Sequence, residues 1–175
     1  MLKLKELLDT QRKFSESLNK KVSANQYVFA MNIEISELLN TLPWKWWKNN
    51  HTIDKEKSLD ELADVLAFWL SWYNLYFDNH RKTASILDVD LYSREVEGLE
   101  AAILKGIAKE TASNPNILSV HYEDNYTMVQ LETAGQRLGK LIAVTMYHTG
   151  AKLQEVIDAY HKKMDINWER QKNNY

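Results

Sequence analysis

Two pairs of acidic residues stand in otherwise apolar parts of the sequence. Glu34 and Glu37 lie within EISELLN, and Glu61 and Asp64 lie within DELADVLAF. Residues three apart on a helix lie on neighbouring faces of one turn, so the side chains of each pair can converge on one object. If the two helices pack side by side, four carboxylates meet, and they stay ionised only if cations compensate for them. Carboxylate oxygens without His or Cys favour hard ions, so the pattern predicts a site for Mg²⁺, with Mn²⁺ as a substitute.

A purely structural interpretation of these acids stays open. Acids on a helix usually form a solvated face, and SLDE at 58–61 fits a capping box in which Glu61 would only bond the backbone of Ser58. Against this, apolar residues occupy two sides of the helix that carries Glu61 and Asp64. Phe68 and Trp72 continue the acidic face, and a separate stripe is made of Leu59, Leu62, Leu66, Trp69 and Tyr73. A helix that is apolar on two sides is expected to be buried on two sides, which would enclose the acids at its N-terminal end.

Tryptophans alternate with lysines between the two acidic pairs, in LPWKWWKNN. One interpretation is a surface aromatic cluster that covers the core. The other is a site where a tryptophan stacks on a planar base while Lys45 and Lys48 face phosphates, because aromatic stacking on a base contributes about 1–3 kcal/mol.

The C-terminal stretch YHKKMDINWERQKNNY predicts a helix with two ridges. The apolar ridge is made of Ile157, Tyr160, Met164 and Trp168. The polar ridge is made of Lys163, Asn167, Arg170 and Gln171. Basic residues at a helix C-terminus often only complement the helix dipole. Beside a magnesium site, the same ridge could hold phosphates, with the arginine as a bidentate fork.

Composition limits the class of protein. The 175 residues suit one domain with a substantial core. The 22 Lys plus Arg and 24 Asp plus Glu give a net charge of −2, which argues against a nucleic-acid-binding surface. The absence of cysteine excludes disulfides, thiolate metal sites and a cysteine nucleophile. The charged, amphipathic start MLKLKELLDT is unlike a signal peptide, and no apolar run approaches membrane-spanning length, so we expect a soluble cytoplasmic protein.

Sparse glycine and proline, 5 and 2 residues, favour helices over a sandwich or barrel. Apolar periodicity predicts an all-α bundle. Its helices are expected at about 3–19, 23–42, 58–80, 92–112, 127–149 and 151–171. The segment 117–130 could be a loop, a short hairpin or the entry to the following helix. We predict a single domain over 1–175, with a core at about 1–80 and 150–175 and a helical insertion lobe at about 81–149.

Taken in order, these stretches resemble the dimeric all-α dUTPases of phages and some bacteria, within the all-α nucleoside triphosphate pyrophosphatases related to MazG. In that family, E-x-x-E and E-x-x-D on neighbouring helices bind the magnesium ions of the nucleotide. The resemblance gives this role to Glu34, Glu37, Glu61 and Asp64. It places Trp47 against the uracil and Lys48 near the phosphates, and it matches Gln11 to a glutamine that helps to recognise the base. The family's terminal pattern is met by Lys163, Asn167, Arg170, Gln171 and Tyr175.

The chain departs from the family pattern at several positions. Phe14 and Ser15 stand where many members have an asparagine, Ala67 replaces a frequent histidine, and Met164 and Asn174 replace an asparagine and a glycine of the terminal pattern. The resemblance covers about 10–80 and 150–175, and 81–149 matches only as a variable helical insertion.

The resemblance implies a single-domain catalytic protein that hydrolyses dUTP, and dUDP as well, to keep uracil out of DNA. Water is expected to attack the β-phosphorus, with Glu34 as the base and Phe68 as a wall against a 2′-hydroxyl. The resemblance further implies a homodimer in the cytoplasm, which is the host cytoplasm if the chain is phage-encoded. Two alternatives stay open: a MazG-like pyrophosphohydrolase with dCTP or broad dNTP specificity, and a non-catalytic helical module that binds a partner protein.

Overall fold

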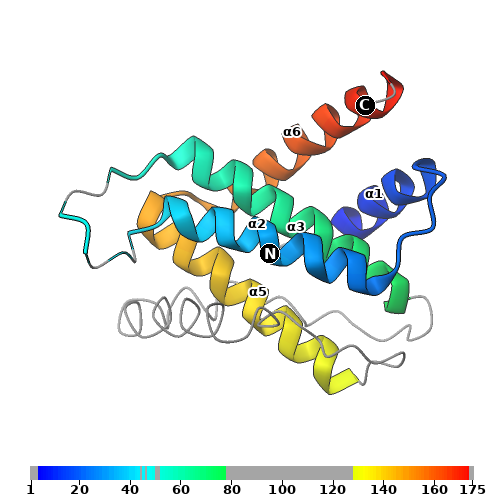
Figure 1. Ribbon diagram of the computed structural model, residues 1–175, viewed down its shortest axis with the longest axis horizontal. Helices are drawn as coiled ribbons and strands as arrows, with labels where there is room; N and C mark the ends of the chain where they lie inside the picture. Colours follow the sequence, from blue (N-terminus) through cyan, green and yellow to red (C-terminus); the bar gives the residue numbers. More distant parts are fainter. Residues whose placement is uncertain (1–3, 44, 46, 50–51, 78–127, 174–175) are drawn as a thin grey trace.

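The structure is a computed structural model, and it describes residues 4–43, 45, 47–49, 52–77 and 128–173. These residues form five α-helices and no strand (Figure 1). The helices are α1 (Leu4–Ser17), α2 (Ala24–Thr41), α3 (Lys55–Phe77), α5 (Met128–Thr149) and α6 (Leu153–Lys172). The expected all-α class is therefore confirmed. None of the helices described is long and apolar enough to cross a membrane.

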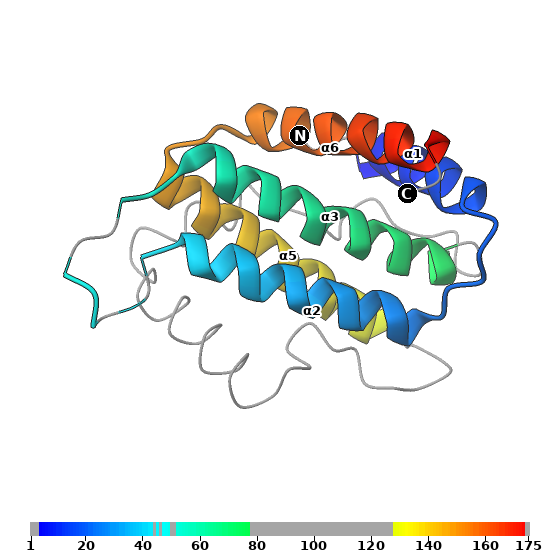
Figure 2. The ribbon, with the colours of Figure 1, turned by 45° about the horizontal axis from the view of Figure 1, so that its top comes forward.

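Helix α3 is the centre of the fold and contacts α1, α2, α5 and α6. Figure 2 shows α2 and α5 on one side of α3, and α6 with α1 on the other. The predicted apolar stripe is buried, and Trp72 on the second apolar side is also fully buried. The expectation that α3 is buried on two sides is thus confirmed, and it explains why α3 can carry a site at the junction of α2 and α6.

The start of α3 corrects one sequence-based alternative. The helix begins at Lys55 rather than Ser58, because Asp54 caps it: the backbone N–H of Lys57 donates to Asp54 Oδ1 at 3.0 Å. Ser58 lies inside the helix, fully buried, and its hydroxyl donates to the Asp54 carbonyl. The capping box proposed for Ser58 and Glu61 is therefore wrong, and Glu61 is available for another role.

Helix α2 begins with a capping box in which Ser23 accepts from the backbone of Gln26 and the Gln26 side chain accepts from the backbone of Ser23. It ends two residues before Pro43. Of the expected lobe, the predicted helix at 92–112 and most of the segment 117–130 lie outside the described residues. Helix α5 is described, and its buried residues, including Leu138 and Ile142, join the same core as α2 and α3.

Candidate metal centre

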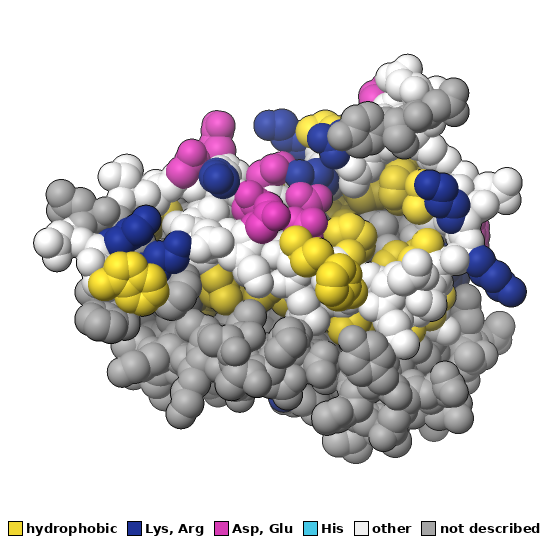
Figure 3. All heavy atoms as spheres, viewed as in Figure 1, with side chains coloured by type: hydrophobic (Ala, Val, Ile, Leu, Met, Phe, Trp, Pro, Cys, Tyr) yellow, Lys and Arg dark blue, Asp and Glu magenta, His cyan; other side chains and the backbone are white. Residues whose placement is uncertain are grey.

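Carboxylates from α2 and α3 meet on one face of the bundle. Glu34, Glu61 and Asp64 each offer an oxygen, and these oxygens all lie within 4.8 Å of one another. Figure 3 shows acidic side chains gathered near the middle of this face, with basic side chains beside them. The arrangement follows from the packing of α2 against α3, which brings Glu34 of α2 beside Glu61 and Asp64 of α3.

The charges of these carboxylates are mutually unfavourable. Burial, followed by the charges of Asp64, Glu37 and Glu61, raises the pKa of Glu34 to about 7, although Lys163 acts in the opposite direction. The pKa of Glu61 is also raised, mainly by burial and then by Glu37. Glu37 is exposed and lies outside the group of three whose oxygens meet. Its charge nevertheless raises the pKa of Glu34 and of Glu61. The cluster therefore favours either a proton or a bound cation.

Lys163 on α6 brings a positive charge to the cluster. Its Nζ lies 2.7 Å from Asp64 Oδ2 and 2.8 Å from Asp60 Oδ2. Burial lowers the pKa of Lys163, but the hydrogen bonds to Asp60 and Asp64 outweigh this effect and raise it. Burial raises the pKa of Asp64, against the hydrogen bond and charge of Lys163 and the charge of Arg170. The structure thus brings two cations of the predicted C-terminal ridge to the acidic cluster.

Asp60 was not predicted as a site residue. It stands four residues before Asp64, so the two carboxylates lie on one face of α3. That spacing was visible in the sequence, but only the position of α6 shows that the two acids share one lysine.

Gln11 lies in a buried polar network between α1, α3 and α6. Its Nε2 donates to Ser71 Oγ at 2.9 Å, and its Oε1 accepts from the Tyr160 hydroxyl at 2.9 Å. Its residue surface is only 3 % exposed. Ser71 lies two turns after Asp64 on α3, so the network sits further along the same side of the helix. Sequence reasoning found the glutamine but missed Ser71 and Tyr160, which hold its amide in one orientation.

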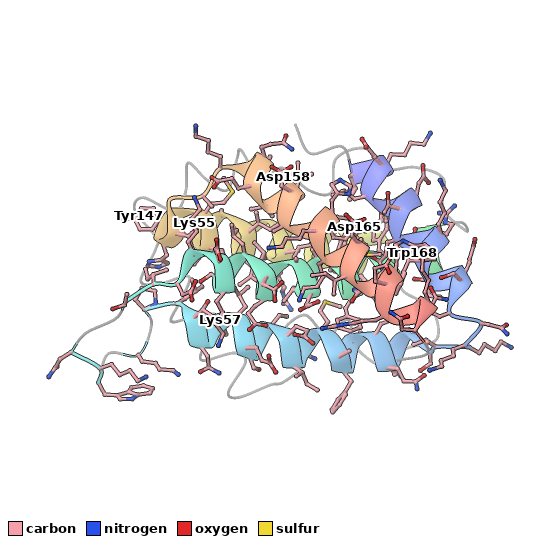
Figure 4. All side chains as sticks on the ribbon, turned by 90° about the horizontal axis from the view of Figure 1, so that it is seen from above. Lys55, Lys57, Tyr147, Asp158, Asp165 and Trp168 are labelled. Atoms are coloured by element: carbon pink, nitrogen blue, oxygen red, sulfur yellow. The ribbon has the colours of Figure 1, made fainter. Side chains whose placement is uncertain are left out.

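The C-terminal part of α6 is attached to α1. Trp168 meets Phe14 edge-on with ring centroids 5.2 Å apart, and Figure 4 shows Trp168 on the part of α6 beside α1. Gln171 exchanges hydrogen bonds with Ser17: the Ser17 hydroxyl donates to Gln171 Oε1, and Gln171 Nε2 donates to the Ser17 carbonyl. Gln171 therefore serves in the structure as a helix-to-helix contact.

Comparison with protein families decides the class. A family model described as dUTPase matches residues 3–175. The chain belongs to this dUTPase family. A comparison with curated proteins gives no match. The enzyme is accordingly a hydrolase, a dUTP diphosphatase that acts on dUTP. The family match spans nearly the whole chain, including the stretch between α3 and α5. Membership favours this activity over both alternatives left open by the sequence.

The remaining predicted residues that the structure describes lie on α3, on α6 and on the connection between α2 and α3. Phe68 is half-buried one turn after Asp64, and Asn167 is half-buried one turn after Lys163. Trp47 and Lys48 lie on the α2–α3 connection, which extends beyond the ends of both helices (Figure 1), and Trp47 is 54 % exposed. Trp44, Trp46 and Tyr175 lie outside the described residues.

Proposed function

We propose that this dUTP diphosphatase uses Mg²⁺ held by Glu34, Glu37, Glu61 and Asp64, with Mn²⁺ as a substitute. The observation that carries the proposal is the meeting of three carboxylate oxygens from two helices within 4.8 Å. The donors are all hard oxygens, without histidine or cysteine, and this set suits Mg²⁺. Burial and the charges of Asp64, Glu37 and Glu61 raise the pKa of Glu34, and a divalent ion in the cluster would offset both effects, which supports the proposal.

The proposed reaction is dUTP + H₂O → dUMP + pyrophosphate, with water attacking the β-phosphorus. Mg²⁺, when bound, neutralises phosphate oxygens and lowers the pKa of water. Glu34 takes the proton from the attacking water, a role supported by its position in the cluster with part of its surface open to solvent. Lys163, Arg170 and Lys48 offset the charge that develops on the leaving phosphate. The ion pair of Lys163 with Asp64 supports the first of these assignments.

We assign recognition of the nucleoside mainly to Gln11 and Phe68. Gln11 uses the second hydrogen of its Nε2 for the uracil, since Ser71 takes only one. Phe68 excludes a 2′-hydroxyl. The other residues proposed to bind the substrate are Trp47, Asn167, Gln171 and Tyr175. We further propose that dUDP is accepted and that the enzyme is a cytoplasmic homodimer, as the family resemblance implies.

Product analysis tests this assignment directly. Purified protein is incubated with each dNTP and with dUDP, with Mg²⁺ or with EDTA, and products are separated by anion exchange. Turnover of dUTP and dUDP that requires Mg²⁺ is expected. Turnover of dCTP or of several dNTPs would support broad MazG-like specificity instead. In H₂¹⁸O, attack at the β-phosphorus places the label in pyrophosphate, whereas label in dUMP would refute the proposed point of attack.

A further inference from the structure

Lys163 is the buried partner in two salt bridges, and the two carboxylates that it binds differ in their exposure to solvent. Its side chain is only 8 % exposed, whereas that of Asp64 is 22 % exposed and that of Asp60 is 57 % exposed. Both carboxylates bind the same Nζ through one oxygen, at 2.8 Å and 2.7 Å. Asp64 belongs to the acidic group whose oxygens meet, and Asp60 does not.

The two carboxylates would respond differently to a divalent cation. A cation bound in the cluster would attract Asp64. The ammonium of Lys163 is also positive, and it already binds an Asp64 oxygen. The cation therefore competes with Lys163 for Asp64. A buried ammonium that loses its partner is strongly unfavourable, because it keeps its desolvation cost without compensation. Asp60 is the group that can prevent this loss, since it already binds Lys163 from outside the cluster.

We propose that Asp60 is a positioning residue that retains Lys163 at the edge of the site when a divalent cation takes Asp64. Lys163 is then an internal counter-ion of the metal-free cluster, and in the loaded site it remains in place to meet the substrate's phosphates. This inference rests on the proposed metal site, and it assigns a role to an acid that binds neither metal nor substrate.

The proposal predicts a specific coupling. In the wild-type protein, the displaced ammonium keeps one partner, so displacement costs little. In Asp60→Asn, Asp64 is the one carboxylate among the described residues that still forms an ion pair with the ammonium, so Mg²⁺ must break a stronger pair. The affinity for Mg²⁺ is then expected to fall roughly three- to tenfold. If Asp60 acted only as a distant negative charge that attracts cations, the loss would be the same whether or not Lys163 is present.

A double-mutant cycle separates these two cases. Isothermal titration with MgCl₂ alone, without nucleotide, is applied to wild type, Asp60→Asn, Lys163→Met and the double variant. Lys163→Met removes the competing ammonium, so tighter Mg²⁺ binding than in wild type is expected. Adding Asp60→Asn to Lys163→Met should change the affinity by less than about twofold. Glu56→Gln is the matched control: it removes an exposed acid one turn earlier on α3 and should leave the affinity unchanged within the same limit.

Each outcome decides the proposal. Equal losses from Asp60→Asn in both backgrounds, or no loss in either, would overturn the positioning role while leaving the metal site intact. Wild-type protein that shows no saturable Mg²⁺ binding would instead overturn the metal site, and this inference with it. Circular dichroism checks that each variant is folded. If Lys163→Met does not fold, Lys163→Gln removes the same charge and carries the same expectation.

Discussion

Binding of Mg²⁺ to the cluster should depend on pH near neutrality, because of Glu34. Burial and the charges of Asp64, Glu37 and Glu61 raise the pKa of its carboxyl to about 7, far above the ordinary value for glutamate. A metal ion binds the ionised carboxylate, so the ion must displace a proton whenever Glu34 is protonated. We therefore compare the binding of Mg²⁺ to the unmodified protein at pH 8 and at pH 6.

The size of the effect follows from the pKa of Glu34. With a value of about 7, the carboxyl is about 91 % ionised at pH 8 and about 9 % ionised at pH 6. The dissociation constant for Mg²⁺ should therefore rise about tenfold between pH 8 and pH 6. Binding should release about 0.9 proton at pH 6 and about 0.1 proton at pH 8 from this group. The raised pKa values of Glu61 and Asp64 act in the same direction.

Isothermal titration measures both quantities. Titrations at pH 6, 7 and 8 give the dissociation constants, and repetition in two buffers with different ionisation enthalpies counts the released protons. Glu34→Gln is the control: it removes the titrating group, so Mg²⁺ should bind more weakly and with much less dependence on pH. Wild-type dissociation constants that agree within a factor of two at pH 6 and pH 8 would refute the assignment, as would binding at pH 6 without proton release.

Three further results are expected. Glu37→Gln and Asp64→Asn should each lower dUTP turnover by at least about 100-fold with unchanged circular dichroism, because each removes a charged ligand; near-normal rates in either would show that the metal assignment is wrong. The metal-free protein should be less stable to urea at pH 8 than at pH 6. The raised pKa of Glu34 contributes stability that is present below the ordinary pKa of glutamate and is lost as the pH rises through about 7. Equal urea midpoints at pH 6 and pH 8 in EDTA would therefore contradict a raised pKa of Glu34. Tyr160→Phe should lower the free energy of unfolding by about 1–2 kcal/mol, because the Gln11 oxygen loses a buried donor; equal urea midpoints for variant and wild type would count against this network.

Local patterns in the sequence were sufficient to predict several features. The three-residue spacing of the acids placed each pair on one turn of a helix, and the two apolar sides of 58–80 predicted a helix buried on two sides. Both depend on helical periodicity, which a short stretch of chain reveals without its neighbours. The same periodicity placed Lys163 and Arg170 on one ridge of the last helix, and both cations act on Asp64 in the structure.

Only the tertiary structure decided which of these groups meet and what each one does. It shows that Lys163 is shared between Asp64 and the unpredicted Asp60, that Gln171 holds α6 to α1, and that Asp54 rather than Ser58 caps α3. Such contacts join residues up to 154 positions apart, and they depend on the packing of α1, α3 and α6. Spacing along a chain determines which side chains share a face, but the partner of a buried charge depends on which other helix packs against that face.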